Sequence, residues 1–278
     1  MNASARMAGD FIYELSLLCL DVFQNEFGKV DDLVHFVVRQ IYYSCQITSE
    51  SALLLLDQGR EWDADVLNRS VAEGLVKLVF ILKSPVNDQA NLAEEFWITM
   101  PENAELRRSD RAKEILDAAA GRGKDSWKPI EELVLNDVQV NAILSKSNRA
   151  ERKRLEQKWS FSEILKFFAA SNDEKVRPLA LLAYNYGMNS HLVHKDGDGV
   201  GMIWERATRD DERREAVVNG HIARGISDIC SFALFRAYYV FMAGGRDFEV
   251  VKTLEKKYDE LFKSLEMDGN EFIIVEYK

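Results

Sequence analysis

Apolar residues recur at intervals of three and four along most of this chain, and only four prolines interrupt them. On a helix, this spacing places the apolar side chains along one face. The pattern therefore predicts an all-α fold, a helical bundle. The expected helices are 8–27, 31–58, 62–83, 88–118, 129–144, 148–157, 160–170, 174–195, 210–242 and 247–266.

The middle of the chain differs from its flanks. Residues 101–160 carry more charge, contain Gly121 and Gly123, and show weaker periodicity. We interpret this segment as a charged insertion of short helices between the N-terminal half of the bundle, 1–100, and its C-terminal half, 161–278.

The last eight residues, 271–278, form the one convincing strand-like segment, and we expect a C-terminal strand-like tail that pairs with another chain or packs as an extended segment. At the other end, the apolar run Phe11–Phe23 is broken by Glu14 and Asp21 and follows no cationic leader. Other apolar runs are too short to cross a bilayer. These features favour a soluble, cytoplasmic protein without a membrane partner.

The cysteines give no metal or disulfide pattern. Cys19, Cys45 and Cys230 are odd in number and widely spaced, which is typical of a protein from a reducing compartment. His191 and His194 lie three residues apart, but no third ligand follows at helical spacing. We expect no metal site and no cofactor.

The charge of the chain limits its contact with nucleic acid. With a net charge of −10, sequence-independent binding of nucleic acid across the whole surface is not expected. A local patch at 146–158 has six basic residues against two acidic ones. Either this is a solvated helix with mixed ion pairs, or it contacts RNA or a partner protein. Its candidate contact residues are Arg149, Arg152, Lys153 and Arg154.

Arg69 and Glu73 stand four residues apart in an otherwise apolar helix. This interval lets the guanidinium and the carboxylate touch on one helical face. The pair is either an ordinary structural ion pair or a fixed charge pair that orients a neighbouring histidine or grips a phosphate.

Tyr186, Ser190 and His194 recur at a four-residue interval, which aligns a phenol, a hydroxyl and an imidazole over about two helical turns. The glycines at 197, 199 and 201 then predict a helix-ending turn. His194 is either a histidine that caps the helix end or a general acid/base, with Tyr186 or Arg69 stabilising charge on a substrate.

Arg214 and His221 match the Arg-x6-His variant of a ribonuclease motif. With 19 arginines and four histidines in the chain, about one such match is expected by chance. The spacing alone is therefore weak support, and both residues are secondary candidates.

The Arg69 and Glu73 motif and the later motif of Tyr186, Ser190 and His194 together resemble a known pattern. Arg69-Ser-x-x-Glu73, followed by Tyr186-x3-Ser190-x3-His194, is similar to a bacterial all-helical family of unknown function that is distantly HEPN-like. The resemblance covers roughly residues 40–200. It implies a bundle in which Arg69, Glu73, Tyr186, Ser190 and His194 converge.

The resemblance also implies a function. It suggests a metal-independent ribonuclease of bacterial antiviral defence or of a toxin–antitoxin system, with His194 or His221 as acid/base and Arg69 on the scissile phosphate. Such sites are often composite across a dimer, so the expected partners are RNA, a second copy, or a protein from the same locus. The alternative is a non-catalytic helical sensor or adaptor that acts through protein–protein contacts, in which the polar residues form a network that fixes the packing. A third possibility is an enzyme with a pocket for a small molecule or an anion, which the sequence neither supports nor excludes.

Overall fold

The computed structural model describes residues 3–277, without the side chains of Tyr184, Asn185, Met188 and Asn189. Within this range the chain is helical and contains no strand, which confirms the all-α prediction. It divides into two compact units, Met1–Ser84 with Ile164–Lys278, and Pro85–Glu163. The charged segment 101–160 lies in the second unit.

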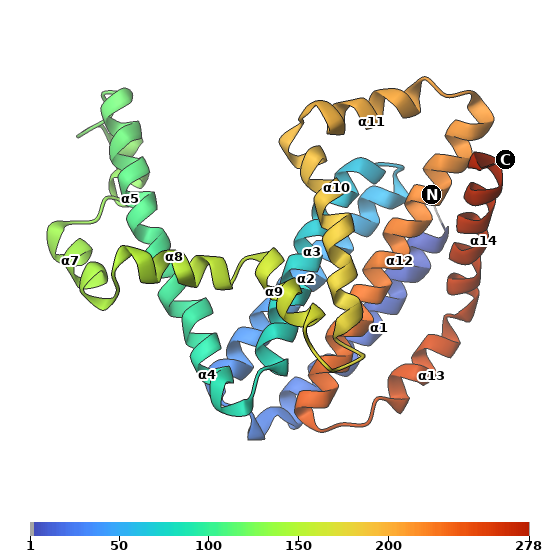
Figure 1. The fold of residues 1–278 in the computed structure, drawn as a ribbon, viewed down its shortest axis with the longest axis horizontal. Helices are drawn as coiled ribbons and strands as arrows, with labels where there is room; N and C mark the ends of the chain where they lie inside the picture. The colour runs from blue at the N-terminus through green and yellow to red at the C-terminus, as the bar shows by residue number, and fades with distance from the viewer. Residues whose placement is uncertain (1–2, 278) are drawn as a thin grey trace. The chain divides into compact units, whose positions relative to one another are not determined.

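The first unit is a bundle arranged around one long helix, α12 (Figure 1). Helices α1, α2, α3 and α14 all pack against α12, and α10 packs against α3. The elements of this unit are α1 (Ala3–Asn25), η1 (Phe27–Lys29), α2 (Asp32–Asp57), α3 (Glu61–Lys83), most of α9 (Phe161–Ala169), η4 (Arg177–Leu181), α10 (Leu182–His194), α11 (Gly197–Ala207), α12 (Asp211–Gly244), α13 (Glu249–Lys257) and α14 (Asp259–Glu276).

Local signals in the sequence set where the main helices begin and end. The side chain of Asp31 accepts hydrogen bonds from the amides of Leu33 and Val34 and so caps α2. Asp210 caps α12 in the same way, and Gly245 ends it with a φ of 72°. These caps explain why the expected helices 31–58 and 210–242 agree closely with α2 and α12.

Much of α12 is buried in the bundle. It is the one helix within residues 3–277 that is long and apolar enough to cross a membrane, and 56% of its apolar stretch is buried against other helices. Its apolar character therefore matches its position in the core.

Residues 271–276 of the expected strand-like tail instead form the end of α14, and Lys278 lies outside the described residues. Phe272 packs directly over Gly220 of α12, where a side chain on residue 220 would lie only 2.6 Å from the Phe272 Cβ. Glu276 forms ion pairs with Arg209 at 2.8 Å and Arg213 at 3.2 Å. These contacts hold the β-branched and aromatic residues of this segment in a helix, against their local preference.

The glycine-rich segment is also different from the expected turn. Gly197, Gly199 and Gly201 all lie inside α11. The preceding helix ends at Lys195, which adopts a left-handed conformation with a φ of 51°, and Asp196 caps α11. A single residue therefore makes the turn, and the glycines belong to the next helix.

The second unit is a separate set of short helices. Glu95 ties two of them together, because its carboxylate accepts hydrogen bonds from Lys158 at 2.7 Å and from the Trp159 indole at 2.9 Å. The elements of this unit are α4 (Val86–Glu94), the π-helical turn η2 (Glu95–Thr99), α5 (Met100–Ala118), η3 (Asp125–Trp127), α6 (Lys128–Glu131), α7 (Asp137–Lys146) and α8 (Arg149–Lys158).

Candidate functional site

Arg69, Glu73 and Tyr186 meet between α3 and α10. The Arg69 Nη2 donates to the Tyr186 hydroxyl at 2.7 Å, and this hydroxyl donates to Glu73 Oε1 at 2.8 Å. Arg69 also lies over the Tyr186 ring, with its Cζ 4.0 Å from the ring centroid, and its Nε lies 3.6 Å from Glu73. Three of the five residues grouped by the sequence therefore form one closed network.

The space beside this network is small. A cavity of about 20 Å³ is lined by Asn68, Arg69, Tyr186 and Asp228, among others, and can hold one water molecule but no nucleotide. Arg69 Nη1 is buried there without a hydrogen-bond partner among the described atoms. Burial raises the pKa of the partly buried Asp228 to about 6, an effect that Arg224 partly offsets.

Ser190 and His194 lie further along α10. His194 is eight residues from Tyr186, about 12 Å along the helix axis, and its side chain is exposed. Ser190 is partly buried. Among the side chains described, neither residue forms a hydrogen bond or ion pair with Arg69 or Glu73.

The corner between α10 and α11 is formed by a close backbone approach. A Cβ at Gly199 would lie 2.3 Å from the His191 carbonyl oxygen, so only glycine fits there. His191 Nδ1 lies 2.8 Å from Asp196 Oδ2, and this hydrogen bond raises the pKa of His191. His191 therefore helps to form the corner between α10 and α11.

A second polar cluster joins α3 to α12. Asp65 is almost fully buried, with 5% of its side chain exposed. Its Oδ2 receives hydrogen bonds from His221 Nε2 and from Arg224 Nη2, both at 2.8 Å, and Arg224 also reaches Oδ1 at 3.0 Å. Burial by itself raises the pKa of Asp65, but the hydrogen bond to His221 and the charge of Arg224 outweigh it and hold this pKa below its usual value.

Arg206 of α11 completes the cluster. Its Nη1 lies 2.7 Å from His221 Nδ1 and 3.3 Å from Glu61 Oε1, and its Cζ lies 4.1 Å from the Trp62 ring centroid. A guanidinium can only donate, so Nδ1 of His221 accepts and the proton of this tautomer is on Nε2, which donates to Asp65. Both ring nitrogens of His221 are thus engaged.

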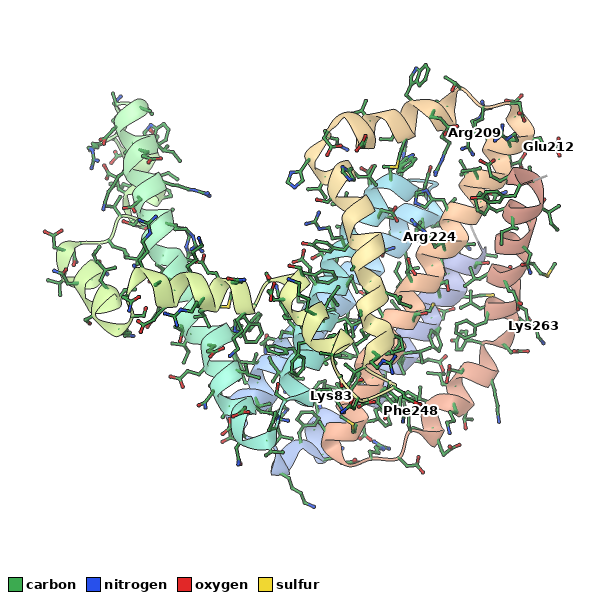
Figure 2. The ribbon with its side chains drawn as sticks, viewed as in Figure 1. Lys83, Arg209, Glu212, Arg224, Phe248 and Lys263 are labelled. Carbon is green, nitrogen blue, oxygen red and sulfur yellow. The ribbon has the colours of Figure 1, made fainter. Side chains whose placement is uncertain are left out.

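This cluster forms one wall of a cavity of about 690 Å³, hereafter the α12 cavity. Its polar wall contains Asp65, Arg206, His221 and Arg224, and Arg224 projects from α12 (Figure 2). The rest of the lining is largely apolar, with Ser227, Glu266 and Asn270 as its polar members, and comes from α3, α10, α11, α12 and α14. It includes Leu192, Met202, Val217, Phe262, Leu265, Phe272 and Ile273.

Other residues selected from the sequence lie on the surface. Arg214 is exposed in the first turn of α12 and forms an ion pair with Asp211. It does not line the α12 cavity, whose polar wall contains His221. In the second unit, Arg149, Lys153 and Arg154 are exposed on α8, whereas Arg152 donates to the Ser147 carbonyl. The three exposed cations remain accessible to a partner.

Sequence reasoning missed Asp65, Arg206, Arg224 and Asp228. A usable signal was present, because residues 221, 224 and 228 are polar at helical spacing within an apolar helix. Asp65 precedes Arg69 by one turn on α3. Within the described part of the chain, no group of three or more histidine, cysteine, aspartate or glutamate side chains is arranged to hold a metal ion.

Comparison with known proteins gives one match. Residues 35–212 match a family model described as a family of unknown function, DUF5677. No curated protein and no solved structure matches the chain. The matched range contains Asp65, Arg69, Glu73, Tyr186 and Arg206 and ends in the first turn of α12.

Proposed function

The chain belongs to the DUF5677 family, and from this starting point we propose that it is a helical binding module whose α12 cavity receives a small amphipathic molecule with an anionic head group. The observation that carries the proposal is Arg224, a cation on the wall of an otherwise largely apolar cavity. This function corresponds to a non-catalytic sensor or adaptor.

The cavity has the size and composition of a ligand site. Pockets for small molecules typically measure about 300–1,000 Å³ and combine an apolar lining with a few oriented polar groups. The α12 cavity, at about 690 Å³, lies within this range. Apolar side chains of the lining would bury the body of the ligand, and the polar wall would orient its head.

Arg224 is suited to hold the anionic head. Only its Nη2 bonds to Asp65, so that Nε and Nη1 have no partner among the described residues. Its side chain is 43% exposed and therefore accessible. A guanidinium with free donors binds a carboxylate, sulfonate or phosphate through charge-assisted hydrogen bonds.

The remaining polar residues keep Arg224 in place. Asp65 fixes its guanidinium, His221 donates to Asp65, and Arg206 in turn donates to His221. Because each of these buried groups is paired, the wall is preorganised, and less side-chain freedom is lost on binding.

One observation favours a second candidate function, a metal-independent ribonuclease. His221 lies between a carboxylate and an arginine, as an oriented general acid/base does. For catalysis, however, a substrate must displace Arg206 from Nδ1 or Asp65 from Nε2. The apolar lining and the overall negative charge also favour a small ligand over RNA.

Binding of anilinonaphthalene sulfonate, which joins apolar rings to a sulfonate, tests the first function. We expect saturable binding with enhanced fluorescence. Gly269 lines the cavity, and a Cβ added there would meet no atom within 4 Å, so Gly269→Leu should fill the space and weaken binding at least tenfold. Gly201→Leu, an equal substitution in open space on α11, should leave binding unchanged.

The charged anchor is tested separately. Arg224→Met should lower the affinity for the dye by roughly tenfold or more, because a charge-assisted hydrogen bond is lost. Equal affinity in the wild type, Gly269→Leu and Arg224→Met would overturn the proposed function.

Cleavage of a fluorescent single-stranded RNA in EDTA tests the second function. Cleavage by the wild type that is lost in His221→Ala and retained in His194→Ala would establish a ribonuclease centred on His221. The reverse pattern would place the catalyst on α10. If the folded wild-type protein does not cleave the RNA, the ribonuclease function is excluded.

A further inference from the structure

Arg236 of α12 is a buried cation that has no counter-ion among the described residues. Its side chain has no exposed surface, and its Nε, Nη1 and Nη2 have no hydrogen-bond partner among the described atoms. Native proteins pair nearly all buried polar groups, and an isolated buried charge is strongly destabilising. Arg236 therefore requires a partner.

The three groups described close to Arg236 do not supply a negative charge. Its Cζ lies 5.7 Å from the Tyr42 ring centroid, which gives a weak cation–π contact. Its charge also acts on Cys19 of α1 and Cys45 of α2. Burial raises the pKa of Cys19 to about 12, and it also raises the pKa values of Cys45 and Tyr42. All three groups are neutral at pH 7.

We propose that Arg236 binds a small inorganic anion, of the size and charge of chloride, in the core between α1, α2 and α12. Water could satisfy the N–H donors, but it would leave the charge uncompensated. A larger organic anion would not fit beside a side chain that has no exposed surface. The anion would thus complete the core and stabilise the fold.

This site is independent of the α12 cavity. Arg236 does not line that cavity, and it is twelve residues, about 18 Å, from Arg224 along the helix axis. A result that contradicts the anion site at Arg236 would therefore not affect the proposed ligand site in the α12 cavity, and the reverse also holds.

Thermal unfolding in sodium gluconate, with gluconate exchanged stepwise for chloride at constant ionic strength, tests the proposal. Because gluconate is too large for the site, chloride should raise the unfolding temperature by about 3–5 °C for each tenfold increase above its dissociation constant. Bromide should act similarly.

Two arginine variants identify the residue responsible. Arg236→Met, an apolar replacement of similar length, should abolish the chloride dependence. Arg214→Met is the matched control on the same helix, because Arg214 is exposed, and it should keep the dependence. An unfolding temperature of the wild type that is the same in gluconate and chloride would overturn the proposal, as would a dependence that persists in Arg236→Met.

A direct measurement decides the question even if Arg236→Met does not fold. Crystals of the wild-type protein grown in bromide should show an anomalous peak within hydrogen-bonding distance of the Arg236 guanidinium. Crystals with only water, or no density, beside this side chain would refute the anion site.

Discussion

His221 and Asp65, which are 156 residues apart in the chain, are joined by a 2.8 Å hydrogen bond between Nε2 and Oδ2. The bond is buried, and it connects the long central helix α12 to α3. It orients the polar wall of the α12 cavity and also holds two helices together. Changes at this pair should therefore affect both binding and stability.

Asp65→Ala should lower the free energy of unfolding by about 3–5 kcal/mol, because it leaves His221 and Arg224 without their shared acceptor. Urea denaturation at pH 7, followed by circular dichroism, measures the change. Asp63→Ala is the control, since Asp63 is exposed on the same helix and should change stability by less than about 0.5 kcal/mol. Equal losses in the two variants would refute a structural role for the Asp65 cluster.

Tyr186→Phe should lower the free energy of unfolding by about 1–3 kcal/mol. The substitution keeps the ring over Arg69 but removes the hydroxyl that links Arg69 to Glu73, so a partly buried donor and acceptor lose a partner. The comparison is Tyr13→Phe, which should have little effect because Tyr13 is 57% exposed. If Tyr186→Phe is as stable as the wild type, the closed network does not support the bundle.

Asp228→Asn should make the protein more stable at pH 8. The folded-state pKa of Asp228 is raised from 3.8 to about 6, so this group favours folding below pH 4 and loses that contribution as the pH rises through 6. At pH 8 the folded state contains a disfavoured carboxylate, which costs about 2–3 kcal/mol. The variant should gain roughly this amount at pH 8 and almost nothing at pH 4.

Urea denaturation between pH 4 and pH 8 measures this difference. Asp65 and Arg224 act on Asp228, and Arg69 lines the same small cavity. The gain is therefore attributed to Asp228 only if it develops between about pH 4 and pH 6 and is constant above that range. A constant difference across the range would contradict the prediction.

Gly199→Ala should destabilise the α10–α11 corner by about 1–3 kcal/mol, because the added methyl group would collide with the His191 carbonyl oxygen. Gly201→Ala is the matched control in the same helix. It meets no atom within 4 Å and should stabilise α11 by about 0.5–1 kcal/mol. Thermal unfolding of both variants gives the sign of each effect, and a stabilising Gly199→Ala would exclude the tight corner.

The helical fold was predictable because its signals are local. Apolar periodicity and caps such as Asp31 and Asp210 act over a few residues, so α2 and α12 agree with the expected helices. The same local reasoning was wrong for the strand-like residues at the end of the chain. There Phe272 packs on Gly220 of another helix, and this contact is not visible in the local sequence.

The sequence by itself determined that this chain is all-helical and that Arg69 and Glu73 share a helical face, because an interval of four residues fixes that geometry. Only the tertiary structure decided which polar groups meet across helices. It added Tyr186 to that pair, left His194 exposed, and brought His221 to both Asp65 and Arg206 at the α12 cavity. The physical reason is that such contacts depend on how helices distant in sequence pack, which no short-range spacing encodes.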